Sequence, residues 1–274
     1  MNPVEEVLTT AFDSIAPFYD ENFTFSNIGK FQRKRVYHFL EKVLPKNQSL
    51  EILEINCGTG EDAVWFAKKG HRVIATDASE KMIEESNSKF LPLQEGPNSK
   101  FRTCGFDKLK EEFSNNKFDL VFSNFGGLNC IDDAQLKKLS ADLFSLLKPN
   151  GKFIAVIMGR KCLWEQFYFL CKLNFRKALR RLSKEGVYAA FGSQVQKTFY
   201  YSPAEFKKIT GTEFRVTVKK PVGIAIPPSY LEPFFKNKTW LLKILNFKER
   251  LLSFSFLSNF ADHYFIALQR RNNI

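Results

Sequence analysis

The feature that most constrains the fold is a short apolar run that leads directly into a turn of small residues. Residues 50–55 (LEILEI) are too few for a helix and rich in Ile and Leu, and NCGTG (56–60) follows at once. A helical pattern then runs over 61–70 and closes on a glycine. Residues 72–76 form a second strand that ends at Asp77. Strand, glycine turn, helix, strand and acid in this order predict a parallel α/β sheet.

The same alternation continues to residue 158 and then changes. Strands are predicted over 100–105, 118–123 and 152–158, and a helix over 133–147. A helical segment over 12–44 precedes the first strand and stops before a proline. After 158 the predicted elements are a long basic-aromatic helix over 160–184, a short helix opening at 202, a strand over 214–222, a second basic-aromatic helical stretch over 233–256 and a last strand over 264–268.

Composition separates the two parts of the chain further. The 274 residues carry a net charge of +12, but residues 1–150 are slightly acidic (19 Lys+Arg, 22 Asp+Glu) and residues 151–274 strongly basic (22 against 7). The second part is therefore expected to face something anionic. The five cysteines form no CxxC pair, which argues against a disulfide framework and a zinc site. We see no transmembrane run and no secretory signal, so a reduced, cytoplasmic chain is the simplest interpretation.

The glycine turn and the acid after the second strand predict where a ligand binds. Gly58 and Gly60 let the backbone pass close under a ligand, and Asp77 is placed to accept hydrogen bonds from ribose hydroxyls. A dinucleotide would need G-x-G-x-x-G, whereas this chain has N-x-G-x-G followed by Glu61 and Asp62, which would repel a pyrophosphate. These carboxylates suit a cofactor with a cationic centre, such as S-adenosylmethionine.

With these residues the chain resembles the class I S-adenosylmethionine-dependent methyltransferases, most of all their quinone and small-molecule members. LEINCGTGEDA is similar to the first motif of that family, VIATDASEKMI to its ribose-acid motif and FDLVFSNFGGLNCI to its fourth-strand motif. LLKPNGKFIAVI resembles the segment before the fifth strand, and FDSIAPFYD the N-terminal lid. Asn56 replaces the first glycine of the motif, a position where Asn tolerates left-handed backbone better than most residues.

The resemblance implies a doubly wound, Rossmann-like α/β sheet, mostly parallel with an antiparallel last strand, plus C-terminal helical cap insertions. Residues 1–48 would form a helical lid, 49–158 the S-adenosylmethionine-binding core, and 159–274 the remaining core strands with cap insertions at about 160–198 and 227–261.

The resemblance also implies roles for single residues around the cofactor. The methionine end, the ribose, the adenine, the methyl group and the lid each receive at least one side chain or turn. Glu54, Asn56, Gly58 and Gly60 would bind the methionine end, and Asp77 the ribose. Ala78, Met82, Phe106 and Asp107 would surround the adenine. Asn124 would lie beside the methyl group, and Tyr19 would be the lid residue over the cofactor.

No general base stands out, and no cluster of metal ligands is seen. Among the three histidines, His38 is expected on a helix surface and His71 in a structural position. His263, beside the last strand, is the weak candidate for a base.

The acceptor is predicted to be small and mostly apolar or aromatic, in one version lipid-like, methylated on oxygen or carbon. SNFGG after the fourth strand lacks the Asn/Asp-Pro-Pro-aromatic motif that resembles amino methyltransferases of nucleobases, which makes nucleic acid an unlikely partner without excluding it. The competing interpretations are an RNA or protein methyltransferase that uses the basic half, and a non-catalytic adenosine-ligand module. The basic-aromatic helices either pack on the sheet as a cap or lie peripherally on an anionic membrane.

Overall fold

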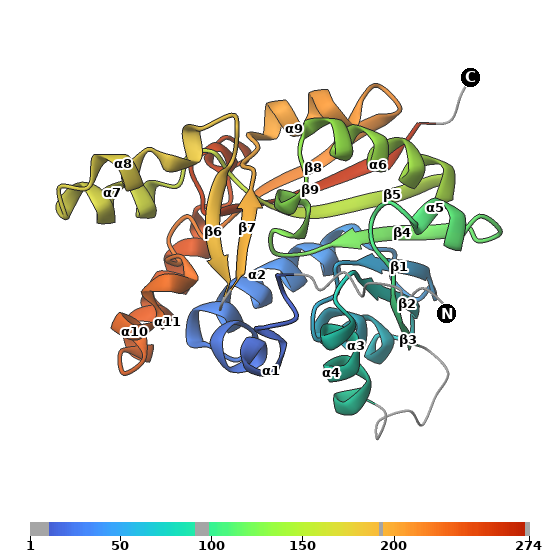
Figure 1. The fold of residues 1–274 in the computed structure, drawn as a ribbon, viewed down its shortest axis with the longest axis horizontal. Coiled ribbons are helices and arrows are strands. Elements are labelled where there is room, and N and C mark those ends of the chain that lie inside the picture. Colours follow the sequence, from blue (N-terminus) through green and yellow to red (C-terminus); the bar gives the residue numbers. More distant parts are fainter. Residues whose placement is uncertain (1–10, 91–98, 192–193, 272–274) are drawn as a thin grey trace, which may run out of the picture.

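A seven-stranded sheet forms the centre of the molecule, seen in the computed structural model, which describes residues 11–90, 99–191 and 194–271 (Figure 1). Its strand order is β3-β2-β1-β4-β5-β9-β8. The strands are β1 (Glu51–Ile55), β2 (Arg72–Asp77), β3 (Ser99–Thr103), β4 (Phe118–Ser123), β5 (Leu147–Met158), β8 (Phe214–Val222) and β9 (His263–Arg270). Neighbours among β1–β5 run parallel, and β9 is antiparallel to both β5 and β8. The predicted fold class, including the antiparallel last strand, is confirmed.

Helices cover both faces of the sheet, which explains the continuous apolar runs of its central strands. One buried cluster lies under α5 (Leu109–Glu112), α6 (Asp133–Leu146) and α9 (Pro203–Thr210). The other lies under α2 (Asn27–Val43), α3 (Glu61–Lys68) and α4 (Glu80–Phe90). Buried aromatic rings such as those of Phe122 and Phe153 fill the two layers. The predicted helices at 61–70, 133–147 and from 202 onward are all confirmed.

The N-terminal helical segment is broken rather than continuous. It consists of α1 (Ala16–Tyr19), a π-helical turn (Asp20–Thr24) and α2. The break occurs because Ser26 caps α2: its hydroxyl accepts a hydrogen bond from the Gly29 N–H at 3.0 Å. The first ten residues of the predicted 1–48 lid lie outside the described residues.

The prediction of one long helix over 160–184 is wrong. The chain forms α7 (Leu163–Cys171), α8 (Phe175–Ala178) and a 3₁₀ turn (Arg180–Leu182). Leu173 lies in the left-handed region at φ +54°, and the Asn174 side chain accepts from the Lys177 N–H to begin α8.

The rest of the C-terminal part adds elements that the apolar pattern did not resolve. A two-stranded hairpin, β6 (Val187–Phe191) and β7 (Gln194–Thr198), was not predicted, and residues 192–193 between its strands lie outside the described residues. The second basic-aromatic stretch is divided into α10 (Glu232–Phe235), α11 (Thr239–Leu251) and a 3₁₀ turn (Ser255–Asn259). In Figure 1, α7, α8, α10 and α11 project from one side of the molecule, away from β3.

Candidate functional site at the carboxyl ends of the strands

The turn between β1 and α3 forms the floor of the candidate site. Asn56 and Gly58 both adopt φ +55°, and Gly60 has φ +80°. A Cβ atom on Gly60 would lie 2.6 Å from a ring carbon of Phe101, so only glycine fits there. Asn56 therefore supplies the left-handed conformation at the position where the family motif has glycine.

Asp77, at the end of β2, is bound to this turn by both of its carboxylate oxygens. One accepts from the Gly58 N–H and the other from the Ser79 N–H, each at 2.9 Å. Burial raises the pKa of Asp77, and these backbone donors oppose that shift. The Ser79 hydroxyl accepts from the Met82 N–H at 3.1 Å, which makes Ser79 the N-cap of the following helix.

The residues predicted around the adenine gather beside Asp77. Ala78 is exposed at the edge of the sheet, and Met82 is buried beneath it in α4. Asp107, which is exposed, and half-buried Phe106 follow β3, and an Asp107 oxygen lies so close to Gly105 that a Cβ there would be 2.8 Å from it. The structure thus brings these residues to one edge of the sheet, and their contact with adenine stays a prediction.

Tyr19 lies over the glycine turn, as expected of a lid residue. Its ring carbon is 3.6 Å from the position of a Cβ on Gly58. Burial raises the pKa of Tyr19 to about 12, so its hydroxyl stays protonated at neutral pH. The next residue, Asp20, accepts from the Thr59 hydroxyl at 2.6 Å and pairs with Lys89, which holds the lid on the turn.

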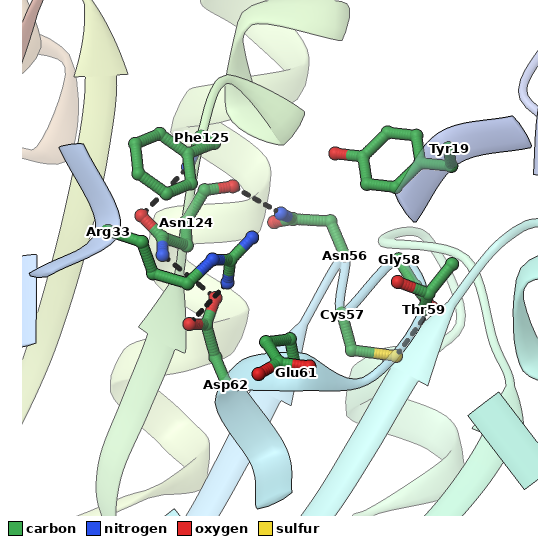
Figure 2. A pocket seen from close by; sticks show the side chains of 10 residues that line it. All are labelled: Tyr19, Arg33, Asn56, Cys57, Gly58, Thr59, Glu61, Asp62, Asn124 and Phe125. Carbon is green, nitrogen blue, oxygen red and sulfur yellow. Dashed lines mark hydrogen bonds and ion pairs between the residues drawn. The ribbon is translucent and has the colours of Figure 1, made fainter. Parts of the chain in front are cut away.

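A small hollow lies between the lid and the turn (Figure 2). It is lined by Tyr19, Arg33, Asn56, Cys57, Gly58, Thr59, Glu61, Asp62, Asn124 and Phe125. Its free volume of about 20 Å³ is the space of a water molecule.

Asp62 is the centre of a polar network that closes this hollow. Its carboxylate is 2.5 Å from an Arg33 guanidinium nitrogen and accepts from the Tyr37 hydroxyl at 2.7 Å. It also accepts from the side-chain amide of Asn124 at 2.8 Å. Asn56 in turn donates to the Asn124 carbonyl oxygen at 2.9 Å, so the ends of β1 and β4 are joined.

Arg33, which reaches the site from α2, was not predicted from the sequence. Its only signal in the sequence is the four-residue spacing from Tyr37, which places both side chains on one helix face. Burial lowers the pKa of the guanidinium, but the charge of Asp62 outweighs burial and raises it. Arg33 therefore carries a fixed positive charge into the hollow.

Two buried polar atoms near this network have no hydrogen-bond partner: one carboxylate oxygen of Glu54, at the end of β1, and the Nε of Arg33. Burial, with the nearby charge of Asp62, raises the pKa of Glu54 well above its ordinary value. Leaving such groups unpaired costs free energy, which a ligand with opposite charges would recover. An amino-acid end, with an ammonium and a carboxylate, supplies both partners, so the residues present fit S-adenosylmethionine.

His263 begins β9 at the same end of the sheet, paired in register with Met158. Its Nδ1 is 3.1 Å from an Asp262 oxygen, and its ring packs edge-on against Phe125 at 5.5 Å. Phe125, at φ +44°, lines the hollow, whereas His263 does not. Burial would raise the pKa of Asp262, but His263 and Arg181 outweigh it and hold the pKa below its ordinary value.

The other two histidines lie in unrelated places. His38 is exposed on α2. His71 is buried and accepts from the Leu50 N–H at 3.3 Å, where β1 and β2 begin, which is the opposite end of the sheet. Within the described ranges, no group of three or more His, Cys, Asp or Glu side chains could hold a metal ion.

A second hollow, of about 510 Å³, shares no lining residue with the first. It lies among α7, α8 and the 3₁₀ turn Ser229–Leu231. Aromatic rings and cationic groups line it: Tyr168, Phe169, Lys172, Asn174, Lys177, Arg180 and Tyr230.

Comparison with known proteins agrees with this geometry. Residues 52–151, which include the glycine turn, Asp77 and β4, match the family described as a methyltransferase domain. The demethylmenaquinone methyltransferase of Clavibacter sepedonicus is 25% identical over 147 residues, which are 54% of this chain and 56% of that protein. The tRNA 5-carboxymethoxyuridine methyltransferase of Escherichia coli K12 is 25% identical over 142 residues, 51% of this chain and 53% of that protein. The chain thus spans about half the length of the curated relatives it matches.

Solved structures extend the likeness to the whole fold. The CcbJ methyltransferase of Streptomyces caelestis has a TM-score of 0.63 at 15% identity, over 96% of this chain and 99% of that one. The magnesium protoporphyrin IX methyltransferase of Synechocystis PCC 6803, solved with bound S-adenosylmethionine, has a TM-score of 0.55 at 16% identity, over 98% and 100%. The domain at 52–151 is therefore a methyltransferase domain in a class I S-adenosylmethionine-dependent methyltransferase fold.

Proposed function

We propose that this chain transfers a methyl group from S-adenosylmethionine to a small, mostly apolar or aromatic acceptor, on oxygen or carbon. The observation that carries the proposal is the pair of unpartnered atoms, on Glu54 and Arg33, beside a glycine turn that is bound to Asp77. One end of the site matches an amino acid and the other a ribose. The match of residues 52–151 to a methyltransferase domain supports the same cofactor.

In this proposal each residue at the rim holds one part of the cofactor. Glu54 and Arg33 bind the charged amino-acid end, Asp77 the ribose, and Ala78, Met82, Phe106 and Asp107 surround the adenine. When bound, S-adenosylmethionine supplies a methyl group on a sulfonium that is already a good leaving group. Tyr19 and Phe125 exclude water from above it, and Asn124 orients the acceptor beside it.

The acceptor is proposed to meet the cofactor at Phe125 and Tyr19, whose rings favour an apolar or aromatic molecule. The relative named for demethylmenaquinone supports this class and extends it to lipid-like acceptors. Where the acceptor is a hydroxyl, His263, whose Nδ1 is 3.1 Å from an Asp262 oxygen, is the candidate to take its proton.

The test combines cofactor binding with product detection. S-adenosylhomocysteine should bind the chain in calorimetry, and Asp77→Asn should weaken this binding about a hundredfold, because two charge-assisted contacts are lost. Asp119→Asn is the matched control: this carboxylate also accepts a backbone N–H, from Glu51 at 2.8 Å, at the opposite end of the sheet. Mass spectrometry of quinol and phenol acceptors should then detect a gain of one methyl group. A chain that binds neither S-adenosylmethionine nor S-adenosylhomocysteine contradicts the proposal.

A second candidate is methylation of RNA, which the basic half of the chain and the relative named for tRNA favour. It predicts RNA binding that falls steeply with salt, and methyl transfer to tRNA in place of the small acceptors. A chain that binds the cofactor and methylates neither class would instead be a protein methyltransferase or a non-catalytic adenosine-ligand module.

A further inference from the structure

The two basic-aromatic stretches, 160–184 and 233–256, expose much of their apolar surface instead of packing it on the sheet. The exposed large apolar side chains are Leu163, Phe167, Leu170, Leu173, Phe175, Leu179, Leu182, Phe234, Trp240, Ile244, Phe247, Leu251, Leu252, Phe254 and Phe256. Large apolar side chains exposed in such number on a few neighbouring elements indicate an interaction site in a folded protein.

Helix α11 shows the arrangement most clearly because it is apolar on two opposite faces. Its inner face packs on a cluster with Ile226 and Phe235, to which it contributes Leu242 and Leu245. Its outer face carries Trp240, Ile244, Phe247 and Leu251, which follow at intervals of four, three and four residues and so share one line along the helix. We call these four residues the outer stripe.

The outer stripe is exposed, with Trp240 and Phe247 each 63% accessible. The inner face explains why the helix forms: it buries Leu242 completely. Nothing in that packing requires a Trp and a Phe on the opposite face, and an exposed stripe of this kind would be unfavourable in water alone.

Basic side chains border the stripe on both sides. At about 100° per residue, Lys243 and Arg250 lie on one flank of the outer stripe and Lys248 on the other. All three are exposed. Long basic side chains in these positions can extend their charged ends to headgroups while the stripe enters the apolar layer.

The carboxylates of the two stretches, Glu165 and Glu249, are buried. The charged side chains that the two stretches expose are therefore all basic. Glu249 is buried and accepts from the backbone N–H groups of Gly223 and Ala225, at 2.8 and 2.6 Å. Glu165 is buried and pairs with Arg180 and Arg181. Neither acid lies at the surface beside the exposed cations.

Helix α7 repeats the same division of faces. Leu163, Phe167 and Leu170 recur at four and three residues and are exposed, with Phe167 at 66%. Trp164 and Tyr168 turn to the same cluster as the inner face of α11. Both helices are therefore fixed to one body while each keeps an apolar line outside.

We propose that the outer stripe of α11 binds an anionic lipid membrane, with the helix lying in the plane of the interface. The charge selects this occupant: a second copy of the chain would bring the same cationic flanks together, and a nucleic acid offers no apolar layer for Ile244 and Leu251. Among the described residues, no helix is long and apolar enough to cross a bilayer. The proposal goes beyond methyl transfer and stands independently of it.

The test is co-sedimentation of the full chain with vesicles of phosphatidylcholine, alone or mixed with phosphatidylglycerol. Binding should require the anionic lipid and weaken in high salt. The double variant Trp240→Ser with Phe247→Ser should lower the partition coefficient about tenfold or more, because it removes the two largest apolar anchors. Tyr188→Ser is its control, since Tyr188 is an aromatic ring on the β6–β7 hairpin that is at least as exposed, at 71%.

Two further double variants distinguish a local contact of the α11 lysines with lipid from a general effect of net charge. Lys243→Gln with Lys248→Gln should weaken binding to anionic vesicles about tenfold and reduce its salt dependence. Lys207→Gln with Lys208→Gln removes the same charge from exposed positions on α9 and should have a much smaller effect.

Three results would overturn the proposal: no binding to either vesicle, equal losses in the variants and their controls, or a dimer in light scattering that Trp240→Ser with Phe247→Ser dissociates without any vesicle binding. Circular dichroism and S-adenosylhomocysteine binding of each variant report whether it folds. Because that binding is measured separately, loss of membrane affinity is distinguishable from failure of the proposed methyl transfer.

Discussion

The cofactor rim, at the carboxyl ends of β1, β2 and β4, and the projecting helices α7, α8, α10 and α11 depart from ordinary folding in opposite ways. In the rim, polar groups are buried: Asp62 is held by three donors, and one Glu54 oxygen has no partner. On the projecting helices, apolar groups are exposed, as Phe247 shows.

The difference teaches what kind of partner each region needs. Folding normally buries apolar groups and leaves charges in water, so a group that is placed against that rule and has no partner within the chain indicates a binding partner. For the rim we propose a small charged molecule, because Glu54 and Arg33 each keep one buried, unpaired polar atom there. For the projecting helices we propose an extended apolar surface with negative charge, because the exposed apolar side chains and cations extend over several elements.

Arg181, next to the projecting helices, is an exception, because there a buried charge is paired within the chain as Asp62 is in the rim. This buried guanidinium joins Glu165 at 2.9 Å to Asp262 at 2.7 Å. Arg181→Met leaves buried Asp262 without its guanidinium partner and Glu165 with Arg180 alone, and should lower the free energy of unfolding by about 3–5 kcal/mol in urea. Arg176→Met, at an exposed position on α8, should change it by less than about 0.5 kcal/mol.

The pH dependence of the Arg181 effect follows from Asp262. Burial would raise the pKa of this carboxyl, but His263 and Arg181 hold it below its ordinary value of 3.8. A lowered pKa stabilises the fold above 3.8 and loses that contribution as the pH falls through the folded value. The deficit of Arg181→Met should therefore shrink in acid, and a deficit that grows there would contradict this assignment.

The sequence sufficed for the rim because its signals are local. A buried parallel strand is a continuous apolar run, a left-handed turn requires Gly58 and Gly60, and Asp77 ends the next strand. Those rules place the residues at one edge without any knowledge of packing. Arg33 escaped them, because its contact with Asp62 joins α2 to α3 and depends on how the two helices pack.

The projecting region was harder to predict for a related reason. Apolar spacing indicates which residues share a helix face, but not whether that face meets protein or solvent. The breaks at Leu173 and before α11, and the β6–β7 hairpin, come from local turns that three- and four-residue periodicity does not reveal. The spacing of Trp240 and Phe247 was visible in the sequence, whereas their exposure was not.

Glu54→Gln tests whether the unpaired carboxylate in the rim costs stability in the free protein and contributes to ligand binding. A carboxyl whose pKa burial raises above 4.5 costs stability as the pH rises from 4.5 toward the folded value, because the proton must be held or a buried charge formed. Glutamine has no proton to lose, so the melting temperature of Glu54→Gln should exceed that of the wild type by an amount that grows with pH. S-adenosylhomocysteine binding should fall about tenfold to a hundredfold, since the ammonium loses its carboxylate.

Its control is Glu51→Gln, on the same strand but at the surface, paired with Arg72. That variant should leave both the pH profile of melting and the calorimetric affinity close to wild type. If Glu54→Gln destabilised the ligand-free protein at all pH values, Glu54 would be a structural residue, and its unpaired oxygen would not indicate a ligand.

The smallest expected effect lies on α11, where one helix carries both an exposed apolar face and a buried one. Phe247→Ala should change the free energy of unfolding in water by less than about 0.5 kcal/mol, because the ring already lies in solvent. Leu242→Ala, five positions earlier on the inner face, should cost about 2–5 kcal/mol, because it opens a cavity in a buried cluster. Urea unfolding without lipid measures both. A large loss of unfolding free energy for Phe247→Ala would mean that its ring stabilises the fold of the free chain. The outer stripe would then serve stability and not membrane binding.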